Sequence, residues 1–245
     1  MAKKRKVVAP RRFDTTQCKE SMYEKYVHRD YFAHCMRWSW VSRLVKAGMS
    51  VLDVGCGQDA PMAKVLSRTA FPMDKRSRYV GVDMNKGVKG HGKTWCEIRE
   101  EFDFTSRYAE LGQFDAVVNL EVIEHMEVED GKALLRGMRE CLAPDGRLYL
   151  STPVFYPSVG AAANHIHEYT IPELKAQIEE CGLEVEARRG TFGNYPVIKK
   201  ALTPEHLAVY EALREFHGDD VMACFMSPLY PDAARNNFWI LRRAH

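Results

Sequence analysis

The sequence lacks any apolar run long enough to cross a bilayer. Runs such as residues 116–118 and 238–241 fall far short of the ~20 residues that a transmembrane helix needs. The N-terminus is basic, but no apolar stretch follows it, which argues against a secretory signal. Hydrophobic residues make up 46% and charged residues 28% of the 245 positions, which excludes a wholly disordered or collagen-like chain. We therefore expect a cytoplasmic globular protein that does not enter the membrane.

Paired cysteines and a dominant sign of charge are also missing. The seven cysteines contain no C-x-x-C pair, which argues against a zinc ribbon and a disulfide framework and favours a reducing compartment. The 35 basic and 33 acidic residues give a net charge of +2, so the chain as a whole is not committed to nucleic acid by charge. Basic residues crowd only the first dozen positions (Lys3, Lys4, Arg5, Lys6, Arg11 and Arg12).

Three regions are predicted along the chain. Residues 1–14 have the composition of a flexible basic arm. Its segment Lys3-Lys4-Arg5-Lys6-Val7 is similar to a nuclear-import signal, so a nuclear location is the alternative to a solvated tail in the cytoplasm. Residues 15–48 carry apolar side chains at helical spacing and are predicted to form a helical lid. Residues 49–245 form the main domain, with an insertion at about 192–235.

The main domain alternates short apolar runs with helical patterns. Strands are predicted at residues 51–54, 79–82, 95–98, 114–119, 147–151, 183–188 and 238–242, and helices at 61–69, 127–142 and 172–181. Such alternation predicts βαβ units and a mostly parallel sheet, which is a doubly wound α/β fold.

The end of the first predicted strand is the most informative stretch. Asp53 leads into a Gly-x-Gly turn formed by Gly55, Cys56 and Gly57, and the second strand ends at Asp83. In open α/β sheets, ligands bind at the carboxyl ends of strands, where Asp83 could accept both hydroxyls of a ribose. The third glycine of a dinucleotide motif is absent, and Asp59 would repel a phosphate at the helix start. The turn therefore favours a nucleoside with no phosphates and with a cationic amino-acid tail, which Asp53 suits.

These motifs resemble those of class I S-adenosylmethionine-dependent methyltransferases over about residues 49–188. Val51-Leu52-Asp53-Val54-Gly55-Cys56-Gly57 is similar to the first family motif, and Asp83, Phe102-Asp103-Phe104 and residues 114–118 and 142–148 follow in family order. Asp59 departs from the glycine that many members have. The resemblance implies a seven-stranded Rossmann-like fold with S-adenosylmethionine as cofactor. It implies cofactor contacts from Asp53, Gly55, Cys56, Gly57, Asp83, Met84, Asp103, Phe104, Leu120 and Glu121.

An E-x-x-E-H segment follows the fourth predicted strand, where the fold presents the methyl group. Glu121, Glu124 and His125, with His165 from a later loop, could hold Mg²⁺ or Mn²⁺, which would lower the pKa of an acceptor hydroxyl. The segment resembles those of ubiquinone-biosynthesis O-methyltransferases and small-RNA 3′-terminal 2′-O-methyltransferases. The alternative is hydrogen bonding with no metal. The candidates for a general base are His125, His165, His167 and Tyr169.

The methyl acceptor is left open between classes. A hydroxyl or amine of a small molecule is favoured because the body of the chain is not basic. Nucleic acid is the rival, through the arm and the basic loops at residues 75–78 and 86–93, although no Asp-Pro-Pro-Tyr tetrad occurs. A cofactor-binding subunit that activates another methyltransferase is a non-catalytic alternative.

One motif competes with this interpretation. Residues Gly87 to Thr94 match G-x-x-x-x-G-K-[ST], the pattern of a phosphate-binding loop, which would indicate an ATPase. That motif requires a helix to open at Lys93 and Thr94, whereas the residues that follow are predicted to form a strand. We interpret the match as a basic surface loop. The sequence does not indicate the oligomeric state.

Overall fold

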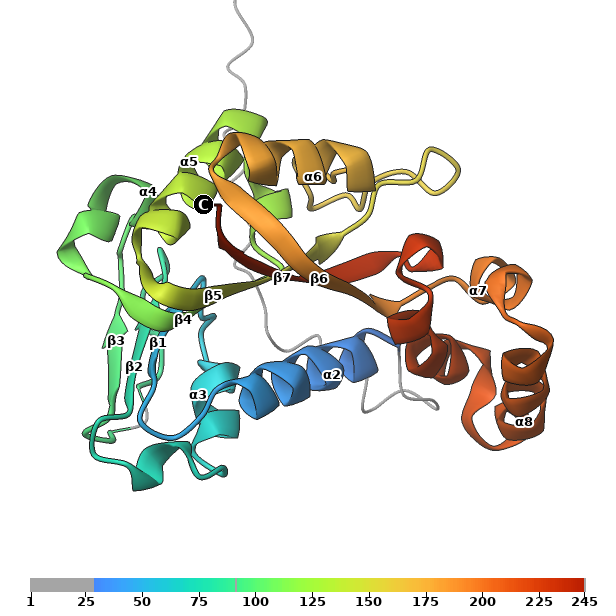
Figure 1. The fold of residues 1–245 in the computed structure, drawn as a ribbon, viewed down its shortest axis with the longest axis horizontal. Helices are drawn as coiled ribbons and strands as arrows, with labels where there is room; N and C mark the ends of the chain where they lie inside the picture. Colours follow the sequence, from blue (N-terminus) through green and yellow to red (C-terminus); the bar gives the residue numbers. More distant parts are fainter. Residues whose placement is uncertain (1–28, 91, 245) are drawn as a thin grey trace, which may run out of the picture.

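The computed structural model describes residues 29–90 and 92–244, shown as a coloured ribbon in Figure 1. The predicted basic arm, its import-like segment and the first half of the predicted lid lie outside these residues. The boundaries predicted for the three regions stay predictions.

A seven-stranded sheet runs through the part of the chain that the structure describes. In chain order its strands are β1 (Ser50–Val54), β2 (Arg78–Val82), β3 (Cys96–Arg99), β4 (Phe114–Leu120), β5 (Leu142–Pro153), β6 (Leu183–Phe192) and β7 (Asn236–Arg243). The spatial order is β3-β2-β1-β4-β5-β7-β6, and β7 pairs antiparallel with both of its neighbours. The predicted doubly wound, mostly parallel sheet is confirmed. Its order reverses between β1 and β4, which is where such sheets bind ligands.

Helices cover both faces of the sheet (Figure 1). One face carries α4 (Phe104–Arg107), α5 (Val128–Glu140) and α6 (Ile171–Glu180), which pack over a core that includes Leu134, Ile178 and Trp239. The other face carries α2 (Arg29–Leu44) and α3 (Pro61–Leu66) over a core that includes Val41, Leu66 and Phe238. Each strand side chain alternates between these cores, so both faces are apolar, as in buried parallel sheets.

Two further helices lie between β6 and β7. They are α7 (Tyr195–Ala201) and α8 (Pro204–Met226), and they sit beyond the sheet beside the start of α2 (Figure 1). Helix α8 is kinked at Gly218, where φ is 76°. Tyr210 and Met222 pack under these helices in a small separate core.

The segment that matches a phosphate-binding loop has the wrong structure for one. Residues 87–90, 92 and 93 have no regular secondary structure, residues 94 and 95 form a turn, and β3 begins directly afterwards at Cys96. No helix opens at Lys93 and Thr94, so no helix N-terminus faces a phosphate there. The ATPase interpretation is contradicted by this geometry.

Among the described residues, no helix combines the length and the hydropathy that crossing a membrane would require.

Candidate active site

The turn after β1 is built so that only glycine fits. Gly55 has φ of 75°, and a Cβ added there would lie 2.5 Å from Cγ2 of Val122. Gly57 has φ of 71°, and its amide donates to Oδ2 of Asp83 over 2.9 Å. The turn therefore brings the backbone close to the residues after β4 and ties it to the end of β2.

Asp83 lies at the mouth of a cavity of about 120 Å³. Its Oδ1 accepts hydrogen bonds from the amide and side chain of Asn85, so the carboxylate has a fixed orientation. The cavity is lined by residues from the ends of β1 and β2 and from α4, among them Gly55, Asp83, Met84, Asp103 and Phe104. The structure thus brings five of the predicted cofactor residues around one hollow.

Asp103 begins α4 and caps it. Its Oδ1 accepts from the amide and hydroxyl of Thr105, and its Oδ2 accepts from the hydroxyl of Ser106. The hydroxyls of Thr105 and Ser106 hold the pKa of Asp103 below its usual value, so the carboxylate is ionised at the cavity edge.

Three of the predicted cofactor residues have other surroundings. Asp53 is buried, and the Tyr79 hydroxyl donates to its Oδ2 over 2.5 Å. Burial raises the pKa of Asp53 to about 7 against the opposing effect of that bond. Cys56 is buried with its sulfur toward Gly81, and Leu120 packs against the core under α2 and α3. None of these three side chains lines the cavity. The Asp53 carboxyl binds the Tyr79 hydroxyl, and its contact with a cationic ligand stays a prediction.

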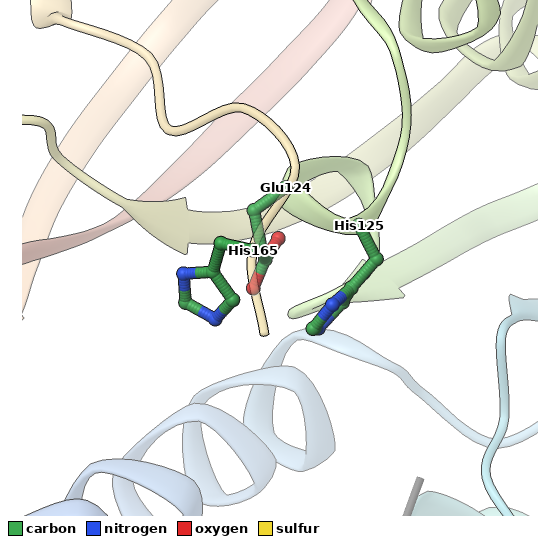
Figure 2. Close-up of side chains that lie close together, drawn as sticks. All are labelled: Glu124, His125 and His165. Atoms are coloured by element: carbon green, nitrogen blue, oxygen red, sulfur yellow. The ribbon is translucent and has the colours of Figure 1, made fainter. Parts of the chain in front are cut away.

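The residues after β4 supply a cluster of metal-binding type. The ligand atoms of Glu124, His125 and His165 all lie within 4.8 Å of one another. Figure 2 shows Glu124 and His125 on the turn that follows β4 and His165 on the loop between β5 and α6. His125 Nδ1 donates to the Asn164 carbonyl at 3.0 Å, and the Glu124 carbonyl accepts from the amides of Ile166 and His167. These hydrogen bonds join the turn after β4 to the loop between β5 and α6.

Burial shifts the pKa values of two residues in this cluster. Burial, followed by the nearby Glu121 carboxylate, holds the pKa of Glu124 well above its usual range. Its Oε2 accepts one hydrogen bond, from Thr152, over 3.0 Å. Burial lowers the pKa of His125, which keeps its imidazole neutral and able to bind a metal. A buried carboxyl beside two imidazoles is the donor set of a divalent ion.

Glu121 does not join this cluster, contrary to the predicted four-residue set. Its carboxylate accepts hydrogen bonds from Ser151 (2.7 Å) and from Asn236 Nδ2 (2.8 and 3.0 Å). The Arg37 guanidinium lies 3.8 Å from it. Burial raises the pKa of Glu121, but Arg37, Ser151 and Asn236 outweigh that effect and leave the pKa below its usual value. Glu121 has φ of 59°, and its side chain lies beside Arg37 of α2.

His167 and Tyr169 also lie apart from the cluster. His167 Nε2 is 2.7 Å from the Glu173 carboxylate at the start of α6. Tyr169 is 1% exposed in the core under α5 and α6, and its hydroxyl accepts from Gln177. Burial raises the pKa of Tyr169, which makes it a poor base. Of the four predicted base candidates, only His125 and His165 converge.

Sequence reasoning missed three charged or polar residues of the site. Arg37 is 1% exposed on α2, and it lies four residues from Ala33 and from Val41, both fully buried, so its place on the buried helix face could have been read from spacing. Glu168 is fully buried beside His165. Asn236 is at the first position of β7, and no sequence signal marks it.

The Arg235 side chain is satisfied within the protein. Its Nη2 lies 2.5 Å from the Glu168 carboxylate. A guanidinium that is 8% exposed needs such a partner in the fold itself.

Comparisons with known proteins agree with this geometry. A family model described as a methyltransferase domain matches residues 23–188. A ubiquinone biosynthesis O-methyltransferase of Xanthomonas axonopodis pv. citri is 30% identical over 171 residues, which cover 62% of this chain and 70% of that protein. Its counterpart in Xanthomonas oryzae pv. oryzae is 33% identical over 132 residues, about half of each chain (52% and 53%).

Two solved structures share the fold. A TehB-like SAM-dependent methyltransferase from Corynebacterium glutamicum matches with a TM-score of 0.56 and 14% identity, covering 93% of this chain and 92% of that one. The 1,6-didemethyltoxoflavin-N1-methyltransferase of Burkholderia thailandensis, solved with S-adenosylhomocysteine, matches with a TM-score of 0.55 and 14% identity, covering 98% and 92%.

Proposed function

The chain belongs to the family of class I S-adenosylmethionine-dependent methyltransferases, and from this premise we propose that it methylates a hydroxyl group of a small molecule with the help of a divalent metal. The observation that carries the proposal is the convergence of Glu124, His125 and His165 directly after β4. The names of the relatives support the hydroxyl, since the aligned Xanthomonas proteins are O-methyltransferases.

The residues present fit the cofactor. A Cβ at Gly55 would collide with Val122, so glycine lets the turn after β1 pack closely against the residues that follow β4. Asp83 is oriented to bind a ribose, and Asp103 and Phe104 border the hollow where an adenine ring would lie. S-adenosylmethionine, when bound, supplies an activated methyl group on a sulfonium.

The residues present also fit a metal, with a different preference from the one predicted. The donors are one carboxylate and two imidazoles, because Glu121 is held elsewhere. Of the two metals predicted, Mg²⁺ takes oxygen ligands almost exclusively, so Mn²⁺ is the one that we propose for this set; imidazole donors also suit Zn²⁺ and Fe²⁺. A bound metal would supply Lewis-acid polarisation of an acceptor oxygen.

The chain's own side chains prepare the acceptor site. The Asn164 carbonyl fixes the His125 ring, and Thr152 fixes the Glu124 carboxyl, so both donors are oriented in advance. Nearby, Arg37 and Glu121 form a buried pair that ties α2 to the end of β4. Positioning of this kind contributes much of the rate of a displacement reaction.

The described basic loops do not favour nucleic acid as the acceptor. Four of their six lysine and arginine charges lie within ion-pair distance of nearby carboxylates, in the pairs Arg76–Asp74, Arg78–Glu97, Lys86–Glu101 and Lys89–Asp59. Paired surface charges give little net field toward a phosphate backbone.

Calorimetric titration tests the cofactor half of the proposal. Wild-type protein is titrated with S-adenosylhomocysteine, and Asp83→Ala is expected to weaken binding at least tenfold because the ribose loses its acceptor. Asp145→Asn, an exposed carboxylate on the far side of β5, is the matched control and should bind as wild type. Equal affinity of all three proteins would contradict the assigned cavity.

Metal titration tests the other half. Mn²⁺ binding is measured by electron paramagnetic resonance for wild type, His165→Gln and the control His217→Gln, which changes an exposed histidine on α8. We expect His165→Gln alone to lose affinity by tenfold or more. Methyl transfer is then assayed on a panel of small catechols and diols, with and without EDTA. Turnover that EDTA leaves unchanged would overturn the metal.

A further inference from the structure

Glu168 is a buried charge next to the cluster. Its side chain is 0% exposed, in the loop at residues 154–170 between β5 and α6. Its Oε1 accepts from the Ala162 amide at 3.0 Å and lies 2.6 Å from His165 Nδ1. Its Oε2 lies 2.5 Å from Arg235 Nη2. A carboxylate held on both oxygens keeps one position and one orientation.

Arg235 extends this contact to the ends of the loop. Its guanidinium donates to the carbonyls of Val154 and Gly160, and its own carbonyl accepts from the Val154 amide at 2.8 Å. The side chain therefore joins β7, the start of the loop and Glu168. Because the Arg235 fork is planar and rigid, it fixes Glu168 more tightly than a lysine could.

The contact determines which nitrogen of His165 carries a proton. Oε1 of Glu168 accepts from the Ala162 amide, and Oε2 lies 2.5 Å from the guanidinium of Arg235, a side chain that keeps its charge in proteins. Paired with that cation, the Glu168 carboxylate can only accept hydrogen bonds. His165 must donate from Nδ1, and a neutral ring with Nδ1–H has its lone pair on Nε2.

We propose that Glu168, held in place by Arg235, is a positioning residue that fixes the ring orientation and the tautomer of His165, so that Nε2 is offered to the cluster with Glu124 and His125. A carboxylate behind a histidine ligand makes the ring a stronger donor and commonly changes metal affinity 10- to 100-fold. The inference rests on the proposed function for the metal, but the tautomer is a property of the protein alone.

The chain provides a matched control for the charge of Glu168. His167 Nε2 lies 2.7 Å from Glu173, a second contact between a histidine and a carboxylate in the same loop, outside the cluster. Glu173→Gln removes that charge and keeps the capping contact with Thr170, because glutamine serves in a capping box as well. Glu168→Gln is likewise close to isosteric.

Nitrogen-15 NMR of histidine-labelled protein reads the tautomer directly. The signals of His165 are assigned by their absence in His165→Gln. We expect wild type and Glu173→Gln to show His165 with Nδ1–H, and Glu168→Gln to show a substantial Nε2–H population. A wild-type ring with its proton on Nε2, or the same Nδ1–H spectrum in all three proteins, would overturn the positioning role.

Mn²⁺ affinity is a second measurement, and it separates the proposed metal site from the proposed positioning role of Glu168. Glu168→Gln should bind Mn²⁺ 10- to 100-fold more weakly than Glu173→Gln, with S-adenosylhomocysteine affinity unchanged in both as evidence of intact folding. If wild type binds no Mn²⁺, the metal assignment fails, and the NMR result alone then supports or overturns the role of Glu168.

Discussion

At the scale of single residues, the two acids of the E-x-x-E-H segment have different tasks. Glu124 belongs to the cluster with the two histidines, whereas Glu121 binds Ser151, Asn236 and Arg37. We therefore expect Glu124→Gln to weaken Mn²⁺ binding at least tenfold and Glu121→Gln to change it less than threefold. Electron paramagnetic resonance titration compares the two. Equal losses of Mn²⁺ affinity in the two variants would mean that Glu121 is also a metal ligand.

Asp53 gives a second prediction at this scale. Burial raises its pKa to about 7 from an ordinary 3.8. A folded-state pKa above the unfolded value means that the folded protein binds the proton more tightly, so the contribution to stability is present below about pH 4 and disappears as the pH rises through 7. Thermal unfolding of wild type and Asp53→Asn between pH 5 and 8 measures this.

We expect the difference in stability between Asp53→Asn and wild type to change with pH. Asparagine retains a neutral side chain at every pH, so the stability of Asp53→Asn relative to wild type should rise as the pH increases across that range. The sign follows from desolvation of the carboxylate, which asparagine avoids. A relative stability independent of pH would mean that Tyr79 keeps Asp53 ionised throughout.

At the scale of elements, helix α2 reaches the site through one side chain. Arg37 donates to His34 Nδ1 over 2.9 Å and lies near Glu121, and burial with the Arg37 charge lowers the pKa of His34 to about 3, so His34 stays neutral. Arg37→Met leaves the buried Glu121 carboxylate uncompensated, which costs about 3–5 kcal/mol in comparable pairs. Chemical denaturation should show a loss of that order.

A double variant separates charge from packing. In Arg37→Met with Glu121→Gln, neither side chain is charged, so most of the loss should be recovered, and hydrogen exchange in α2 should return towards the wild-type rate. If the double variant is as unstable as the sum of both single variants, Arg37 acts through packing alone.

Prediction from sequence succeeded where local signals exist. The turn glycines Gly55 and Gly57 and the acid Asp83 follow strands that their apolar runs reveal. In the structure Gly55 and Asp83 line the cavity, and the Gly57 amide donates to Asp83. It failed where the partner of a side chain comes from a distant segment of the chain. The partner of Glu121 comes from β7 and that of Arg235 from the β5–α6 loop, and neither contact leaves a periodicity or a spacing in the chain. The predicted strand at 238–242 also began too late, since Asn236 already pairs with Pro153.

At the scale of the whole molecule, paired surface charges predict weak attraction for polyanions from the described part of the chain. Binding of a short single-stranded RNA, measured by fluorescence anisotropy, should be no tighter than about 10⁻⁴ M at 150 mM salt, the weak end of non-specific binding. A variant without residues 1–14 should behave in the same way. Micromolar binding with a steep salt dependence would favour a nucleic-acid acceptor.

The antiparallel β7 has a consequence for assembly order. It lies between β5 and β6, which do not pair with each other; Asn236 is its first residue, and Arg235 directly precedes it. During synthesis, every residue of the cluster and of the cofactor hollow therefore leaves the ribosome before the strand that completes the sheet. A nascent chain halted at residue 230 would contain all those groups, but Glu121 and Glu168 would lack the partners that orient them. Competence for the reaction should thus appear abruptly, when Arg235 and β7 insert, and not gradually as the chain lengthens.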